Sequence, residues 1–373
     1  MQSSAHLANI VAWGGFVLAF IFGAVGHQAN FCTMGAVSDM VNMGDWSRMR
    51  MWLLSIAIAI LGANGLQALG YIDLSKSIYL APDFTWLAHI LGGLVFGVGM
   101  TLASGCGSKT LIRLGAGDLR SLVVFAFLGI SSYMTLKGLF GVWRTGYIEP
   151  VAVNFLAYGI NGQDLPTLLS GVIGIGKQTL QIAVAGIVAA VILAFVFKDY
   201  RFRSNRNYVF AGLAVGLVVV GGWYVTGHIG YAENPDTLEM TFFGTNTRAA
   251  ESLTFVAPLG YSLELLMLWS DSSLHVSFGI AAVAGVIAGS FAHATFSKNF
   301  RMQGFRDAKD TANHMLGGVL MGFGGVTALG CTIGQGITGF STLALGSIIT
   351  FFAIVTGAAL TMKYQYWKMP HES

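Results

Sequence analysis

The sequence predicts an all-α polytopic membrane protein with about nine transmembrane helices, short re-entrant helices and an inverted internal repeat. Three observations lead to this fold class. Hydrophobic residues make up 54% of the 373-residue chain and charged residues only 10%, whereas soluble proteins carry roughly 25% charged residues. Apolar runs long enough to cross a bilayer recur along the chain. A glycine-rich stretch near the middle of the first half also returns in the second half.

The composition excludes two broad classes of protein. So few charges cannot cover the surface of a soluble enzyme of this length, and a net charge of +3 is too small to indicate a nucleic-acid partner. The chain holds 50 glycines but only 6 prolines, which suits close helix packing in lipid rather than a disordered segment. We therefore expect a single integral membrane domain over 1–373.

The transmembrane elements follow from segment length, because a bilayer core requires about 20 mostly apolar residues per helix. The segment 252–269 is apolar but short and contains Glu264, so we expect it to be re-entrant or interfacial. The nine expected spans are 10–27, 51–70, 86–105, 121–143, 171–197, 208–230, 276–297, 313–331 and 342–362.

The basic residues predict the orientation of these spans, because cytoplasmic loops are enriched in Lys and Arg. Nine spans place the two termini on opposite sides of the membrane. With the N-terminus outside, 15 of the 20 basic residues fall in cytoplasmic segments and 3 in outer segments. The long acidic segment 231–275 then lies outside. We expect a periplasmic N-terminus and a cytoplasmic C-terminus.

The internal repeat joins residues 89–106 to residues 314–331 at a constant offset of 225, with nine of 18 positions identical. A histidine opens both copies and a cysteine closes both. The first copy is expected to run inward and the second outward, so the copies are inverted. Many secondary transporters have this architecture and hold substrate at the repeat interface near the midplane. The repeat halves are expected at approximately 10–143 and 208–362.

Each of the three cysteines stands where an apolar run meets glycines. Glycine lets the backbone bend or approach a ligand closely, and a broken helix exposes N–H groups that bind anions. A thiol adds a weak donor on a polarizable atom. This combination favours a ligand with a soft sulfur end and an anionic end, although buried thiols that only fill space are the alternative. The candidate residues of the substrate path are Cys32, Cys106, Cys331, Gly105, Gly107, Gly330, Gly334, Gln335, Lys109 and Arg113.

Other chemistry has little support in the sequence. Two glycine–lysine segments resemble phosphate-binding loops, but the one at 171–178 has Gln where Ser or Thr is needed and the one at 105–110 has the wrong spacing. We find no metal-ligand cluster and no catalytic-triad spacing. No cofactor and no metal are therefore expected, and ATP-driven transport by this chain alone is disfavoured.

Three cysteine motifs, in order, resemble those of the YeeE/YedE family of bacterial inner-membrane proteins, whose YeeE-type members take up thiosulfate. The resemblance extends over essentially the whole chain. It implies a bundle shaped like an hourglass, a location in the bacterial inner membrane, and cysteines that pass thiosulfate along through S–H···S contacts. Two departures are Lys109 where relatives often have Gly, and Ala116 where they usually have an acidic residue. The motifs are 31–35 with Asp39, then Gly105-Cys106 with Arg113, Gly115 and Gly117, then 330–336.

The resemblance predicts a thiosulfate importer that is not an enzyme. Cys106 and Cys331 are expected near the middle of the path, and Cys32 near one mouth. A cytoplasmic sulfur-carrier protein is a possible partner. Two alternatives stay open: a membrane sulfurtransferase with a persulfide-forming cysteine activated by Lys109 or Arg113, and a transporter of a selenium compound.

Overall fold

The structure is a computed structural model that describes residues 2–368 except 175, 236, 272 and 306. Helices dominate it, and the strands form two short antiparallel pairs, β1 (Asp83–Phe84) with β2 (Val153–Asn154) and β3 (Tyr231–Glu233) with β4 (Met240–Phe242). The predicted all-α polytopic class is thus confirmed. The α-helices are α1 (Gln2–Gln28), α2 (Thr33–Ser38), α3 (Ser47–Ala68), α4 (Trp86–Leu102), α5 (Gly107–Gly115), α6 (Leu119–Lys137), α7 (Leu139–Trp143), α8 (Leu165–Ile173), α9 (Lys177–Phe197), α10 (Tyr200–Ser204), α11 (Arg206–Tyr224), α12 (Val256–Met267), α13 (Phe278–Phe296), α14 (Ala308–Thr327) and α15 (Leu345–Lys368). Short 3-10 or π turns are η1 (Asp39–Met43), η2 (Leu74–Lys76), η3 (Ile78–Leu80), η4 (Arg144–Ile148), η5 (Phe155–Tyr158), η6 (Val225–Ile229) and η7 (Gly334–Gly339).

Among the described residues, eight helical stretches are long and apolar enough to cross a membrane. The ninth expected span, 313–331, forms α14, a 20-residue helix that begins with a polar turn. The segment 252–269 contains the short apolar helix α12, and its re-entrant or interfacial placement stays a prediction. Two expected spans are interrupted. In the span 121–143, helix α6 stops at Gly138, whose backbone is extended. The span 171–197 is divided at Gly174, whose φ of +73° ends helix α8.

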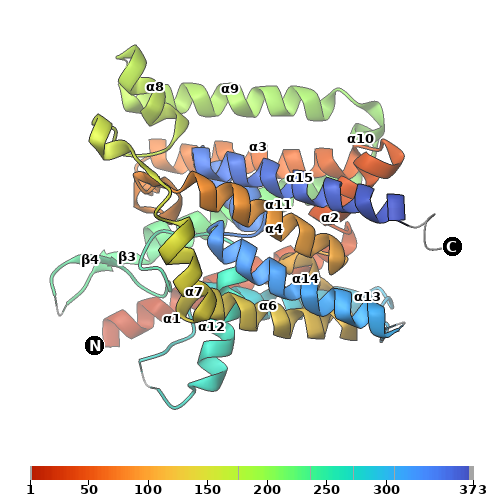
Figure 1. Cartoon of the computed structure of the whole chain (residues 1–373). Helices are drawn as coiled ribbons and strands as arrows, with labels where there is room; N and C mark the ends of the chain where they lie inside the picture. The colour runs from red at the N-terminus through yellow and green to blue at the C-terminus, as the bar shows by residue number, and fades with distance from the viewer. Residues whose placement is uncertain (1, 175, 236, 272, 306, 369–373) are drawn as a thin grey trace.

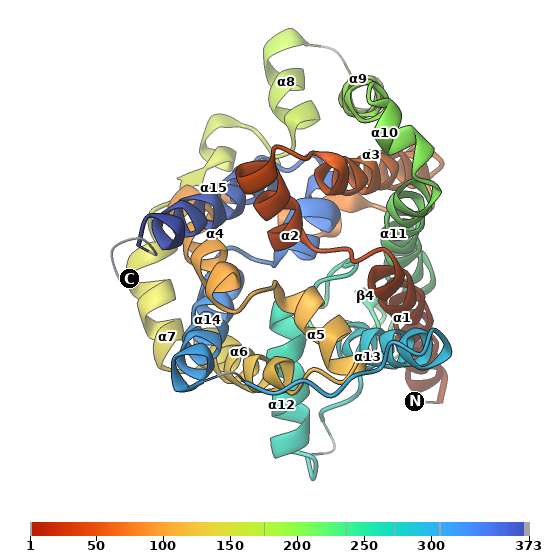
Figure 2. The same cartoon turned by 90° about the vertical axis from the view of Figure 1, so that its right-hand side faces the viewer.

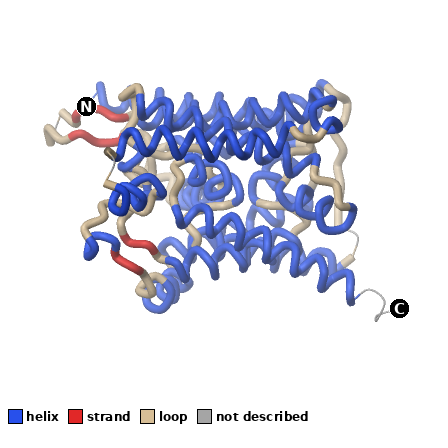
Figure 3. The backbone as a smooth tube through the Cα atoms, turned by 90° about the horizontal axis from the view of Figure 1, so that it is seen from above, coloured by secondary structure: helices blue, strands red, loops and turns tan. Residues whose placement is uncertain are grey.

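The long helices form two groups of four, and each group contains two helices from the first half of the chain and two from the second half. One group holds α1, α3, α11 and α13, and the other holds α4, α6, α14 and α15. Viewed along the helices, the two groups lie on opposite sides, with α2 and α5 between them (Figure 2). Seen from above, short helices and loops fill the space between two bands of long helices (Figure 3). This arrangement places the short helices that follow the cysteines in the middle.

The repeated segments pack against each other through glycine, and their contacts match in pairs. A Cβ on Gly92 would lie 2.7 Å from the Ala328 N atom, and a Cβ on Gly317 would lie 2.7 Å from the Ala103 N atom. These two contacts are equivalent at the offset of 225. The helices α4 and α14 therefore run antiparallel about a local two-fold axis, in agreement with an inverted repeat. The division into halves at 10–143 and 208–362 stays a prediction.

The two ends of the molecule are distinct. The N-terminus, β3 and β4 lie at one end, and α10 and the C-terminus lie at the other (Figure 1). We call these the N-terminal end and the C-terminal end. The accessory helix α9 packs on α3 outside both groups of four, where Gln181 Nε2 donates to Asn64 Oδ1 at 3.0 Å and to Gln67 Oε1 at 2.7 Å.

Candidate functional site

The three cysteines occupy the same kind of backbone position. The helix before each one ends at a left-handed residue: Asn30 at φ +52°, Ser104 at +55° and Leu329 at +60°. The N–H of the residue after the left-handed one donates to a carbonyl in the last turns of that helix. In the two repeat copies, Gly105 N–H donates to Met100 O at 2.9 Å and Gly330 N–H donates to Gly325 O at 2.7 Å. Helices often end this way, because the turn satisfies carbonyls that the helix leaves free. Each cysteine is the second residue after the left-handed one, so it begins the next short helix.

The structure brings the three thiols together. Cys32 is 5% exposed, and Cys106 and Cys331 are fully buried. The Cys106 thiol is close enough to interact with the thiols of both Cys32 and Cys331. The order Cys32, Cys106, Cys331 therefore forms a row, which we call the thiol row.

Local hydrogen bonds orient each thiol. Gly35 N–H donates to Cys32 Sγ, and Gly334 N–H donates to Cys331 Sγ, both at 3.4 Å. Cys106 Sγ lies 3.2 Å from Ser108 Oγ and also contacts the Thr332 hydroxyl. The Cys106 thiol thus has a hydroxyl neighbour from each repeat copy.

The candidate glycines differ in how closely the structure packs against them. A Cβ on Gly334 would lie 2.5 Å from Thr254 Oγ1, and a Cβ on Gly330 or on Gly105 would lie 3.2 Å from its nearest neighbour. Gly107 has only ordinary contacts, the nearest at 3.7 Å. Packing therefore requires glycine at Gly334, while Gly107 serves to begin α5 without a side chain.

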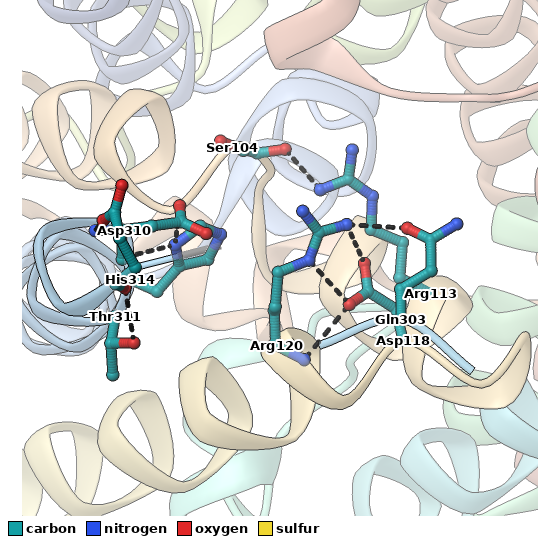
Figure 4. A network of polar contacts seen from close by, with 9 residues as sticks. Ser104, Arg113, Asp118, Arg120, Gln303, Asp310, Thr311 and His314 are labelled. Atoms are coloured by element: carbon teal, nitrogen blue, oxygen red, sulfur yellow. Dashed lines mark hydrogen bonds and ion pairs between the residues drawn. The ribbon is translucent and has the colours of Figure 1, made fainter. Parts of the chain in front are cut away.

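Two candidate cations lie at the Cys32 end of the row. Lys109 is 8% exposed, and its Nζ donates to Asn30 Oδ1 while interacting electrostatically with Cys32 and Cys106. Arg113, the other candidate cation, donates from Nη1 to Ser104 O at 2.7 Å (Figure 4), and its part in the substrate path stays a prediction. Lys109 is therefore the cation of the row, and Arg113 holds the turn that positions Cys106.

A polar cluster supports this end from outside. Arg120 makes two hydrogen bonds of 3.0 Å to Asp118 and one of 2.8 Å to Gln303 (Figure 4). Arg48 binds both carboxylate oxygens of Asp39, at 2.5 and 2.8 Å. The two ion pairs are local contacts next to α2 and α5, and the Arg120–Gln303 hydrogen bond links the start of α6 to the second half of the chain.

Several buried polar atoms near the row have no hydrogen-bond partner among the described residues. Gln335 donates through Nε2 to Ala328 O, but its Oε1 is unpartnered, as are Thr33 Oγ1 and Trp52 Nε1. Trp52 stacks on Phe31 with ring centroids 5.1 Å apart. The Thr33 hydroxyl and the Trp52 indole N–H are spare donors that can bind the oxygens of a passing anion, because an unsatisfied buried donor is costly, whereas Gln335 Oε1 is a spare acceptor.

Sequence analysis missed some of these neighbours. The two hydroxyls Thr33 and Thr332 each follow a cysteine directly, so a repeated Cys-Thr pair was the available signal. Tyr79 interacts electrostatically with both Cys331 and Glu251, and it comes from a distant loop with no motif around it. Within the described part of the chain, no group of three His, Cys, Asp or Glu residues is arranged to hold a metal.

Comparisons with known proteins give the family of this chain. A family model described as sulphur transport matches residues 28–360. The chain is 25% identical over 348 residues to a thiosulfate transporter TsuA from Spirochaeta thermophila, covering 92% of this chain and 96% of that protein. It is 27% identical over 332 residues to a thiosulfate transporter TsuA from Escherichia coli K12, covering 87% of this chain and 86% of that protein. The matched residues include all three cysteine motifs and both repeat copies, so the chain belongs to the sulphur-transport family.

Proposed function

We propose that this protein imports thiosulfate across the bacterial inner membrane along the thiol row. The observation that carries the proposal is the row of three buried thiols between the two groups of long helices. A thiol is a weak donor to the soft terminal sulfur of thiosulfate. Weak, repeated contacts suit passage, since tight binding would trap the anion. The names of the two relatives support thiosulfate as the substrate.

The direction of passage is proposed to be from Cys331 to Cys32. The N-terminal end is then periplasmic and the C-terminal end cytoplasmic, which agrees with the excess of basic residues such as Arg201 and Arg203 on α10. Lys109 lies near Cys32 and attracts the anion after it has passed Cys331 and Cys106. A soluble sulfur-carrier protein at the cytoplasmic end would consume the product.

Import of a dianion requires an energy source. Moving each charge against a negative-inside potential costs about 2.3 kcal/mol per 100 mV. Consumption by a carrier protein or entry of protons with the anion offsets this cost. Purified protein in liposomes, without a carrier protein, can separate consumption by the carrier from entry of protons.

The second candidate function is a sulfurtransferase, favoured by the position of the Lys109 ammonium beside two thiols. In that reaction a cysteine thiolate attacks the outer sulfur of thiosulfate, forms a cysteine persulfide and releases sulfite. The two functions have different products. A transporter delivers intact thiosulfate, and a sulfurtransferase separates its two sulfur atoms.

The test uses purified protein in liposomes and thiosulfate labelled separately in its outer and inner sulfur atoms. We expect both labels to enter in equal amounts, and a variant with Cys32, Cys106 and Cys331 all replaced by Ala to lose uptake. Folding of that variant is checked by its thermal unfolding midpoint. Uptake by the cysteine-free variant at the wild-type rate would overturn the proposal, and release of labelled sulfite with a persulfide on Cys106 would favour the enzyme.

A further inference from the structure

One buried carboxyl group lies beyond the Cys331 end of the thiol row and has no role so far. Glu251 is 7% exposed and belongs to the segment between η6 and α12. Its backbone is held from both sides, because Thr226 Oγ1 donates to Glu251 O and accepts from Glu251 N–H at 3.2 Å. Ala250 pairs with Ser77 beside it. The backbone that carries this buried carboxyl group is therefore fixed in position.

The side chain of Glu251 lacks a cation partner among the described residues. Thr247 Oγ1 donates to Glu251 Oε2 at 3.0 Å, and the titratable groups that face it from η3 and α12 are the phenols of Tyr79 and Tyr261.

The nearby cations are engaged elsewhere or exposed. Lys137 Nζ binds Glu264 at 2.5 Å, Lys76 Nζ binds the Tyr231 hydroxyl at 2.6 Å, and Arg248 is exposed. A buried carboxylate without a compensating cation is unfavourable. Burial accordingly raises the pKa of Glu251 from its usual range to about 7.

Contacts connect this carboxyl group to the thiol row. Tyr79 interacts electrostatically with both Glu251 and Cys331, and its ring packs on Gly339 of η7. Thr254, three residues after Glu251, packs on Gly334, whose N–H donates to the Cys331 thiol. A charge on Glu251 is therefore placed to act on an anion at Cys331.

We propose that Glu251 is a proton-binding site that controls entry of the anion to the Cys331 end of the thiol row. When the carboxyl group carries a proton, this end is neutral and a dianion can approach. When it is ionised, its negative charge repels the dianion in a poorly solvated setting, where electrostatic forces are stronger than in water. The proton comes from the outer solution, and bond changes are limited to protonation of one carboxylate oxygen. The inference rests on the proposed transport of thiosulfate.

The expected pH dependence follows because only the ionised form of Glu251 repels the dianion. Below pH 7 the group is protonated and uptake is fast, and above pH 7 uptake falls as the group ionises. A single group with a pKa of about 7 is about ten times more protonated at pH 6 than at pH 8. Thiosulfate stays a dianion over this range, so its own charge does not vary.

The experiment measures thiosulfate uptake into liposomes at external pH 6 and pH 8, with internal pH and membrane potential held constant. The wild type should lose about ten-fold between these values, and Glu251→Gln should differ by less than about two-fold. Thr247→Val should move the midpoint to higher pH, because the lost hydrogen bond stabilised the ionised form. Glu233→Gln, an exposed carboxyl on β3, is the matched control and should keep the wild-type profile.

A second measurement tests the group without transport. The infrared band of a protonated carboxylic acid should titrate near pH 7 in the wild type and be absent from Glu251→Gln. A wild-type profile retained in Glu251→Gln overturns the inference, and so does the absence of that band. No uptake by the wild type at any pH overturns the transport proposal instead, which the labelled-sulfur experiment shows independently.

Discussion

The two repeat copies share a backbone but differ in charge. Ser104 and Leu329 have nearly the same left-handed φ, +55° and +60°, and each is followed by glycine and then cysteine. After the cysteine the sequences diverge, with Ser108-Lys109-Thr110 in one copy and Ile333-Gly334-Gln335 in the other. The two copies therefore share the geometry that presents a thiol, while one copy is cationic and the other neutral.

This difference gives the thiol row an electrical direction. Lys109 lies near Cys32 and Cys106, and the carboxyl group of Glu251 lies beyond Cys331. In the proposed import, an anion enters past the carboxyl group and moves toward the ammonium group. Symmetric backbones alone would hold an anion equally well in either copy, so the asymmetric side chains distinguish an entrance from an exit.

The largest expected effect comes from removing one thiol at a time. Cys106→Ala and Cys331→Ala should each lower thiosulfate uptake by at least about 100-fold, a loss of roughly 2.7 kcal/mol of transition-state stabilisation, because each removes one link of the row. Both variants should unfold at nearly the wild-type temperature. If only one of them loses uptake, the two copies do not act as equivalent links.

The next effect concerns the charged copy. Lys109→Met keeps much of the side-chain length but removes the ammonium group, and we expect uptake to fall by about ten-fold, or 1.4 kcal/mol. The exposed Lys363 provides the control, since Lys363→Met should transport at the wild-type rate. If both variants lost uptake equally, the rate would depend on the net positive charge of the protein rather than on a charge beside Cys32. If both kept the wild-type rate, the ammonium group of Lys109 would have no role in uptake.

The last prediction concerns stability rather than uptake and tests the symmetry of the seam between α4 and α14. Gly92→Ala and Gly317→Ala each place a methyl group against backbone at 2.7 Å, so we expect both to destabilise the protein by about 1–3 kcal/mol. Gly186→Ala on α9 has no neighbour within 4 Å and should leave the unfolding midpoint unchanged or raise it slightly. Thermal unfolding in detergent measures all three. Clearly unequal losses at Gly92 and Gly317 would contradict the local two-fold axis.

Much of the fold was predictable, because apolar length and glycine spacing are local properties of a sequence. The segment 252–269 was correctly expected to be short, and the repeat was visible as an offset. The break at Gly138 was missed, since the residues beyond it stay apolar although the backbone turns away. The mixing of helices from both halves within each group of four was also beyond reach, because hydropathy does not specify partners.

The site residues likewise include some that the sequence predicts and others that it does not. The cysteines, their glycines and Lys109 stand in recognisable motifs. Glu251 was only one acid in a long acidic segment, because its burial depends on the pairing of Ala250 with Ser77, far apart in sequence. Contacts between distant segments, which one sequence does not reveal, decide its burial.

The paired glycine contacts of α4 and α14 also have a meaning for the origin of the protein. A surface that meets its own counterpart in this way is the surface by which two identical subunits join about a two-fold axis. The seam therefore has the form of a homodimer interface that has become internal to one chain. Two separate half-length chains, inserted in opposite orientations in one membrane, would already possess everything that this interface requires.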